Sequence, residues 1–401
     1  MILVQDRTHS MAKIIAKLTA LGIFLKQFYF FSPKSLQIGD VALLFAAGLY
    51  VLTCGIQFHR IDAPYYLFIL LACGINGIYS ILNGVFIEET IYLVFVTLII
   101  AFLFRPILQE EKFLDYLQFA FRAALLLQLV LYVTNWGRWL DYWRYIGTFN
   151  DPNQYGFYVF IAFLGQHLID AMKHKRLNWI WLGITTLEII TSGSTGMTIG
   201  MIVFAVVYFL VGNNNEGVTI NRFFGIMAMG LLMILVVVFS KQITAYFKNT
   251  GIYLFQKNDD RMNAAEGVLG RFIIDRGLTR VIENPQFLLF GASGGLWGRF
   301  PIEGWYMPTI EIHSTMVALA FSYGIIPYSI LIIWMVRNLR GIKKGLLCVY
   351  IALFVEAFTL VNHRQSYFWL MIMIGSMAQA KRDNTPLFCP EKRLKFYWER
   401  G

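Results

Sequence analysis

Long apolar runs separated by short polar connections dominate this chain. A run of about 17 to 25 mostly apolar residues is long enough to cross a membrane as a helix. The runs predict spans at residues 14–31, 38–56, 65–86, 90–108, 113–133, 154–172, 179–191, 195–212, 223–240, 309–336, 345–361 and 366–380. We therefore expect an all-α fold, a polytopic membrane helix bundle of about twelve transmembrane helices.

One polar segment, residues 241–308, is too long to be a simple connection between spans. Within it, residues 261–283 predict an amphipathic helix, because apolar positions recur at near-helical spacing from Val268 to Ile282. Asn284 followed by Pro285 ends this helix. The chain is thus expected to comprise a membrane bundle of about nine spans at 1–240, the long loop at 241–308, about three spans at 309–380 and a basic tail at 381–401.

Composition supports the membrane class and narrows the partners. Hydrophobic residues make up 57% of the chain and charged residues 14%, well below the charged content of soluble domains. The net charge of +10 does not indicate nucleic acid, because the basic residues lie mainly in short loops rather than in one patch. The cysteines Cys54, Cys73, Cys348 and Cys389 lack the spacing of metal ligands.

The distribution of lysine and arginine predicts the orientation. Alternate connections hold most of the basic residues, including the run 173–176 and the residues from Arg337 to Lys344. Because short cytoplasmic loops carry the excess of positive charge, both termini are expected in the cytoplasm and the loop 241–308 outside. The first span is the weakest, since it carries Lys17 and Lys26.

Several arginines then fall on the outer side, where cations in short loops are disfavoured and need a reason. They are Arg138, Arg144, Arg271, Arg276, Arg280, Arg299 and Arg364. A guanidinium grips a diphosphate through two parallel hydrogen bonds and stays charged at physiological pH. The alternative is local pairing, of Arg276 with Asp275 and of Arg280 with Glu283.

His313 stands at the entry to an apolar span, two residues after Glu311. A neutral imidazole there can act as a general base on a sugar hydroxyl or donate to a phosphate oxygen. The alternative is a histidine that is simply hydrogen-bonded at a membrane interface.

Two short outer segments also carry polar groups. In the segment 147–154, Asp151 is expected to cap the following helix, with Pro152 at its first position. The segment 192–196 is rich in small residues and predicts either a tight helix contact or a pocket of backbone donors.

Three charged residues fall inside predicted spans, namely Arg122, Glu188 and Glu356. A charge inside a membrane is costly unless it is paired or hydrated. They indicate either an ion path, which keeps a transporter under consideration, or structural pairing within the bundle.

The order of these motifs resembles the O-antigen ligase and polymerase superfamily. The resemblance rests on Arg144 before the segment 147–153, the small-residue segment 192–196, Gly270-Arg271 opening a helix that ends before a glycine-rich turn, and His313 followed by Gly324. These motifs cover the chain from about Arg138 to Ile333.

The resemblance implies an inverting, metal-independent glycosyltransferase of the bacterial inner membrane that acts on the periplasmic face without a cofactor. Its substrates would be undecaprenyl-diphosphate-linked glycans, with membrane lipid and a chain-length regulator as further partners and no nucleic acid. Carried over to this chain, Arg271 would neutralise the leaving diphosphate and His313 would position or deprotonate the acceptor hydroxyl. Arg144 and Asn153 would line the same cavity, and we add Arg276, Arg280 and Arg364 as substrate-binding candidates.

Two departures favour a polymerase of O-antigen or capsular polysaccharide over a ligase. Thr195 stands where ligases of this superfamily carry an arginine, and Ser314 follows His313 in place of the common asparagine. An O-antigen ligase that transfers the glycan to lipid A core, and a flippase for lipid-linked oligosaccharides, stay as alternatives.

Overall fold

The computed structural model describes residues 2–30, 37–140, 144–211, 277–301 and 311–383. These residues are mostly helical, as predicted, and almost no strand is present among them. The helices of the first half are α1 (Ile2–Leu25), α2 (Ile38–Cys54), α3 (Ala63–Asn83), α4 (Glu89–Ile99), α5 (Arg105–Ile107), α6 (Phe113–Val133), α7 (Pro152–Met172), α8 (Trp179–Ser192) and α9 (Thr195–Val211). Those of the second half are α14 (Leu278–Glu283), α15 (Thr315–Tyr323), α16 (Ile325–Leu339), α17 (Leu347–Ala357) and α18 (Ser366–Asp383).

Three helical stretches of the described chain are long and apolar enough to cross a membrane: Arg60–Asn83, Glu89–Ile107 and Phe113–Val133. In the second stretch, a π-helical segment (Ile100–Phe104) joins α4 to α5 without interrupting the run. The fold is therefore compatible with an all-α membrane protein. The predicted span at 223–240 lies outside the described residues.

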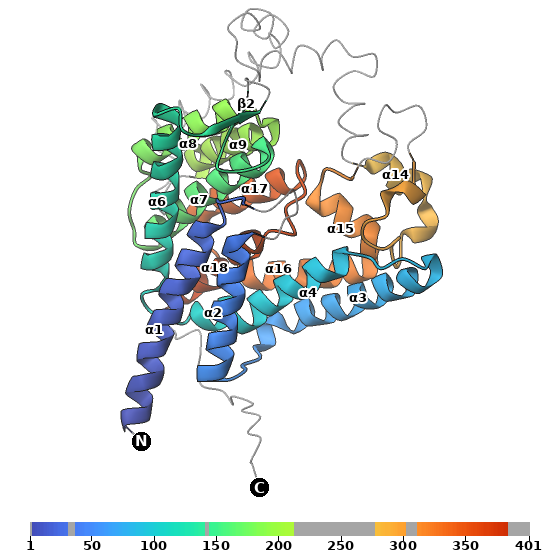
Figure 1. The fold of residues 1–401 in the computed structure, drawn as a ribbon, viewed down its shortest axis with the longest axis horizontal. Helices are drawn as coiled ribbons and strands as arrows, with labels where there is room; N and C mark the ends of the chain where they lie inside the picture. The colour runs from blue at the N-terminus through green and yellow to red at the C-terminus, as the bar shows by residue number, and fades with distance from the viewer. Residues whose placement is uncertain (1, 31–36, 141–143, 212–276, 302–310, 384–401) are drawn as a thin grey trace, which may run out of the picture.

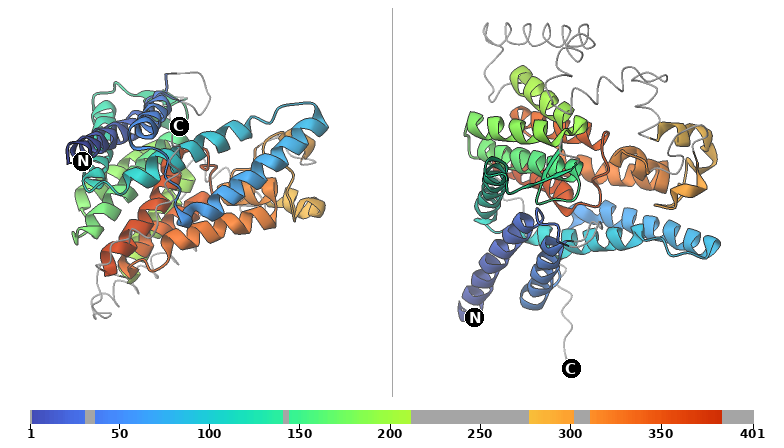
Figure 2. Two further views of the ribbon diagram at one scale, coloured as in Figure 1. Left: turned by 90° about the horizontal axis from the view of Figure 1, so that it is seen from below. Right: turned by 45° about the horizontal axis from the view of Figure 1, so that its top comes forward.

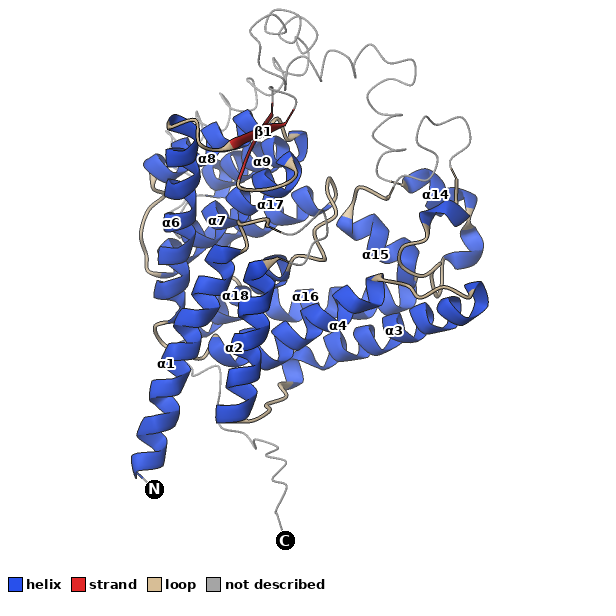
Figure 3. Ribbon diagram, in the orientation of Figure 1, coloured by secondary structure: helices blue, strands red, loops and turns tan. Residues whose placement is uncertain are grey.

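Helix α7 lies among α6, α8, α9, α17 and α18, while α3, α4 and α15 extend to one side of this group (Figures 1 and 2). Every α7 residue from Tyr155 to Asp170 is buried, as expected for a helix that neighbours enclose on all sides. It contacts α6, α8, α9 and α18, while α3 packs against α4 and α16. A short antiparallel hairpin, β1 (Arg138–Leu140) and β2 (Arg144–Gly147), lies against α6, α7 and α8 (Figure 3).

Two ion pairs inside the bundle have both side chains buried and join residues far apart along the chain. Arg105 donates from Nε and Nη2 to the two carboxylate oxygens of Asp62, at 2.7 Å each, and Trp334 Nε1 donates to the same carboxylate at 2.8 Å. Lys26, which weakens the first predicted span, pairs with Asp40 at 2.7 Å, and both side chains are buried. A buried ion is tolerated when its partner and further hydrogen bonds replace water.

The apolar run 309–336, predicted as one span, is divided in the structure. Its described part forms two helices, α15 and α16, which are separated at Gly324. Gly324 has φ +74°, a conformation that side chains other than glycine rarely adopt. The apolar pattern did not reveal the break, because hydrophobic residues continue on both sides of it.

Candidate functional site

A polar cluster that joins distant parts of the described chain surrounds Glu89, the first residue of α4. His363 Nε2 lies 2.6 Å from Glu89 Oε1, and Arg364 Nε donates to Glu89 Oε2 at 2.9 Å. Glu89 is buried and His363 and Arg364 belong to the connection between α17 and α18. The start of α4 and the connection between α17 and α18 therefore meet at this carboxylate, which the sequence did not single out.

Arg364 is held from both sides. Its Nη2 lies 2.5 Å from Glu311 Oε1, and its guanidinium lies over the Tyr92 ring at 5.5 Å from the centroid. Burial lowers the pKa of Arg364, but the charges of Glu89 and Glu311 together outweigh burial and raise this pKa above its ordinary value. Arg364 is thus a permanent cation in a fixed orientation, and its side chain is still 23% exposed.

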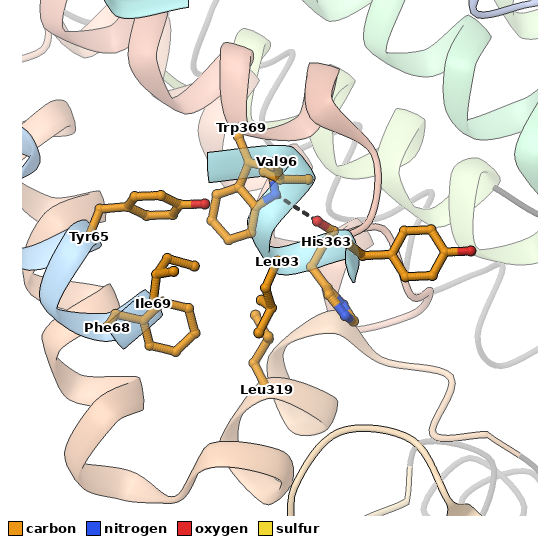
Figure 4. Close-up of a pocket in the computed structure, with 9 residues that line it drawn as sticks. Tyr65, Phe68, Ile69, Leu93, Val96, Leu319, His363 and Trp369 are labelled. Carbon is orange, nitrogen blue, oxygen red and sulfur yellow. Dashed lines mark hydrogen bonds between the residues drawn. The ribbon is translucent and has the colours of Figure 1, made fainter. Parts of the chain in front are cut away.

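The backbone around the cluster is fixed by its own hydrogen bonds. Trp369 Nε1 donates to the carbonyl of His363 at 2.7 Å, as Figure 4 shows. Asn362 N donates to Thr315 Oγ1 at 2.6 Å, which ties the 360–365 connection to the first turn of α15. A small apolar pocket lies against His363, between α3, α4, α15 and α18. Apart from His363, its lining is mainly aromatic and aliphatic and includes Phe68, Leu93 and Trp369.

The glycine-rich segment closes the cluster from another side. Gly294 N donates to Asn76 Oδ1 at 3.1 Å, and a Cβ on Gly294 would come within 2.7 Å of Glu89 Cγ. Asn76 also donates to Thr90 Oγ1 at 3.1 Å, next to Glu89 in the chain. Only a glycine at position 294 allows the loop to approach the carboxylate this closely.

The same segment occupies the break between α15 and α16. Ala292 N donates to Phe321 O at 2.9 Å, Ser293 N donates to Ser322 O at 2.8 Å, and Ile325 N donates to Leu288 O at 2.7 Å. The loop thereby satisfies backbone groups that the interrupted helix leaves free, which apolar surroundings require. In membrane proteins, non-helical backbone at membrane depth is tolerated where it is buried in protein or lines a water-filled cavity.

His313 lies on the connection that brings Glu311 to this cluster. Its side chain is half-buried, and Ser314 after it caps α15 by accepting from Val317 N at 3.2 Å. The serine that departs from the family pattern therefore has a local structural role. His313 is two residues from Glu311 along the chain and so belongs to the same segment as the Arg364 partner.

A second polar cluster contains the two predicted residues Arg144 and Asn153. Arg144 Nε donates to Ser192 O at 2.9 Å and Nη2 donates to Asn153 Oδ1 at 3.2 Å. Ser194 Oγ also lies 3.2 Å from that oxygen. The segments 147–154 and 192–196, about forty residues apart along the chain, are thus in contact, and Asp151 caps α7 as expected.

The remaining predicted residues have different positions. Arg280 is buried in α14, where its Nε donates to Phe300 O at 2.8 Å and its guanidinium lies 5.8 Å from the Trp297 ring centroid. Burial lowers the pKa of Arg280, and Glu283 opposes this effect. Its neighbours pack on a small apolar cluster that includes Ile312, so Arg280 lies beneath the His313 segment. Arg271 and Arg276 lie outside the described residues, as does most of the predicted helix 261–283.

Sequence reasoning missed Glu89 and the pairing of His363. The available signal was a pair of acidic residues, Glu88 and Glu89, at the start of a predicted span, on the side where the sequence predicts unexplained cations. Within the described residues no three His, Cys, Asp or Glu side chains gather as a metal site. No protein-family model and no curated protein sequence matches this chain.

Proposed function

We propose that this protein is a glycosyltransferase that polymerises undecaprenyl-diphosphate-linked repeat units into O-antigen or a related surface or capsular polysaccharide. It would act at the periplasmic face of the bacterial inner membrane, with about twelve membrane helices and both termini in the cytoplasm. The motifs that resemble the ligase and polymerase superfamily are the source of the proposal.

The observation that supports it best is the fixed, partly exposed arginine Arg364. Glu89 and Glu311 orient its guanidinium before any ligand arrives, and Tyr92 supports its face. A pre-oriented donor loses little freedom when it binds an anion, so its hydrogen bonds contribute more to transition-state stabilisation. A lipid-linked diphosphate would present such an anion at the membrane surface.

Charge balance shows that Arg364 does not act alone in this proposal. Glu89 and Glu311 carry two carboxylates against one guanidinium, so the cluster does not attract a diphosphate by its net charge. The proposal therefore assigns the neutralisation of the leaving group to Arg271, and positioning of the donor to Arg364. His313 would position or deprotonate the acceptor hydroxyl, and Arg144 with Asn153 would line the path of the glycan.

The direct test is a reconstitution. Purified protein in liposomes receives only the lipid-linked repeat unit of its source strain, and the products are separated on a gel. A ladder of glycan products of increasing chain length is expected. Arg271→Ala and Arg364→Ala are expected to remove it. Arg176→Ala is the control, because Arg176 is exposed on the connection between α7 and α8.

The same assay separates the alternatives. Product that forms only after lipid A core is added would make the protein a ligase. Full ladder formation by Arg271→Ala would refute the assignment of the leaving-group role. If the folded protein forms no product in either reaction, the proposed glycosyltransferase activity is refuted. Transport of lipid-linked oligosaccharide is then the remaining alternative.

A further inference from the structure

Glu188, in the middle of the bundle, differs from the other charged residues predicted inside spans. Arg122 donates to Asp170 at 2.7 Å and to Gln166 at 3.0 Å, and Glu356 accepts from Asn362 at 2.5 Å. Glu188 is 1% exposed, and neither of its carboxyl oxygens has a hydrogen-bond partner in the part of the chain that the structure describes. The three residues are therefore not equivalent, because among the described residues no group hydrogen-bonds to the Glu188 carboxyl.

In the part of the chain that the structure describes, the surroundings of Glu188 supply hydroxyl groups, and no cation hydrogen-bonds to it. On α7, Tyr155 lies near enough to interact electrostatically with Glu188, and its buried hydroxyl likewise has no hydrogen-bond partner among the described residues. From β2, Tyr145 faces it and donates to Gln128 O at 3.4 Å, while Tyr132 of α6 packs against Tyr145. The α9 sequence contains no charged residue.

The nearest fixed cation acts on the next turn of the helix. Arg144 of β2 donates to the carbonyl of Ser192, four residues after Glu188 on α8. Its guanidinium makes no hydrogen bond to Glu188, because neither carboxyl oxygen has a hydrogen-bond partner among the described residues. Glu188 thus lies one helical turn beneath the polar cluster of Arg144 and Asn153.

An ionised carboxylate in these surroundings would lose its hydration without gaining a partner, and this is among the most unfavourable arrangements in a protein. A carboxyl in such a place is stable as the neutral acid, in which the hydroxyl of the acid and that of Tyr155 are the two donors available. The neutral acid also needs no metal or other cation.

We propose that Glu188 and Tyr155 form a proton-binding site inside the bundle, in which Glu188 carries its proton at neutral pH. The site lies one turn from the outer polar cluster and is distinct from the glycosyl-transfer residues. Whether Glu188 carries a proton therefore does not depend on the proposed enzyme activity.

Dicyclohexylcarbodiimide tests the proposal, because this apolar reagent enters membrane proteins and adds only to carboxyl groups that carry a proton. The purified full chain in detergent is labelled at a series of pH values and the modified peptide is located by mass spectrometry. Labelling of Glu188 is expected at neutral pH, decreasing as the pH is raised and unchanged by added Na⁺. Asp62 is the internal control, since it is equally buried but paired with Arg105, and it is expected to stay unlabelled.

Infrared spectroscopy provides a second measurement that does not depend on access of the reagent. The carbonyl band of a protonated carboxylic acid is expected in the wild-type protein and lost in Glu188→Gln. Because glutamine resembles the neutral acid in shape and charge, this variant is expected to fold with an unchanged Tm. The proposal is overturned if the band persists in Glu188→Gln, or if Na⁺ protects Glu188 from the reagent at constant pH, which would make the site a cation site.

Discussion

The carboxylate of Glu89 lies between two side chains of the connection from α17 to α18. His363 Nε2 lies 2.6 Å and Arg364 Nε 2.9 Å from its oxygens. This arrangement joins the start of α4 to the segment before α18, which is 274 residues away along the chain. Because one buried carboxylate contacts both side chains, its loss should disturb the whole cluster rather than one contact.

Glu89→Gln tests this dependence. The amide retains the volume of the carboxyl but removes the charge that faces Arg364 and one acceptor of the cluster. We expect a loss of about 1–3 kcal/mol in stability and at least a tenfold drop in polymer formation, about 1.4 kcal/mol. Thermal unfolding and the reconstituted ladder assay measure the two effects. The neighbouring exposed residue provides the control, and Glu88→Gln should stay within about 0.5 kcal/mol of wild type.

Arg364→Lys separates charge from geometry. Lysine keeps the positive charge, but a single ammonium cannot contact Glu89 and Glu311 through a planar fork. We expect polymer formation to fall about tenfold or more while the protein remains in the membrane. Arg176→Lys, an exposed substitution of the same kind, should leave the ladder unchanged. Equal activity of Arg364→Lys and wild type would show that only charge matters at this position.

Helix existence and the residues of local caps could be predicted from the sequence, whereas the charge partners could not. The run at 113–133 is α6 with the predicted bounds, and Asp151 caps α7, because both depend on neighbouring residues. The resemblance predicts that Arg144 and Asn153 line one cavity. In the structure the two side chains are in contact, with Arg144 Nη2 3.2 Å from Asn153 Oδ1. The partners of Arg364 are 275 and 53 residues away, so no local pattern indicates them.

Asp62→Asn tests the buried ion pair between Asp62 and Arg105. Asp62 accepts from both Arg105 and Trp334, so the neutral amide leaves the Arg105 charge buried without its counter-ion. We expect destabilisation of about 3–5 kcal/mol. Asp115→Asn is the matched control: Asp115 pairs with Lys173 but is 58% exposed, so its replacement should change stability by less than about 1 kcal/mol. Similar Tm values for the two variants would contradict this account.

Gly324→Ala tests the break between α15 and α16. A Cβ at Gly324 would collide with the carbonyl of Leu289, and a Cβ at Gly291 would collide with the carbonyl of Ser322, so the two glycines let the loop and the broken helix approach each other. Gly55 has nearly the same backbone angles, φ 77° and ψ −179° against φ 74° and ψ 170°, but open space around it. Gly55→Ala therefore reports the conformational cost alone, about 1–3 kcal/mol.

Gly324→Ala should destabilise the protein by roughly 1–3 kcal/mol more than Gly55→Ala, because the loop must also move away from the helix break. Thermal unfolding of the two variants in the same detergent gives this difference directly. Movement of the loop would also shift Gly294 away from Glu89, so Gly324→Ala should weaken the ladder while Gly55→Ala leaves it intact. Equal losses of stability in the two variants would mean that the loop does not pack in the break as described.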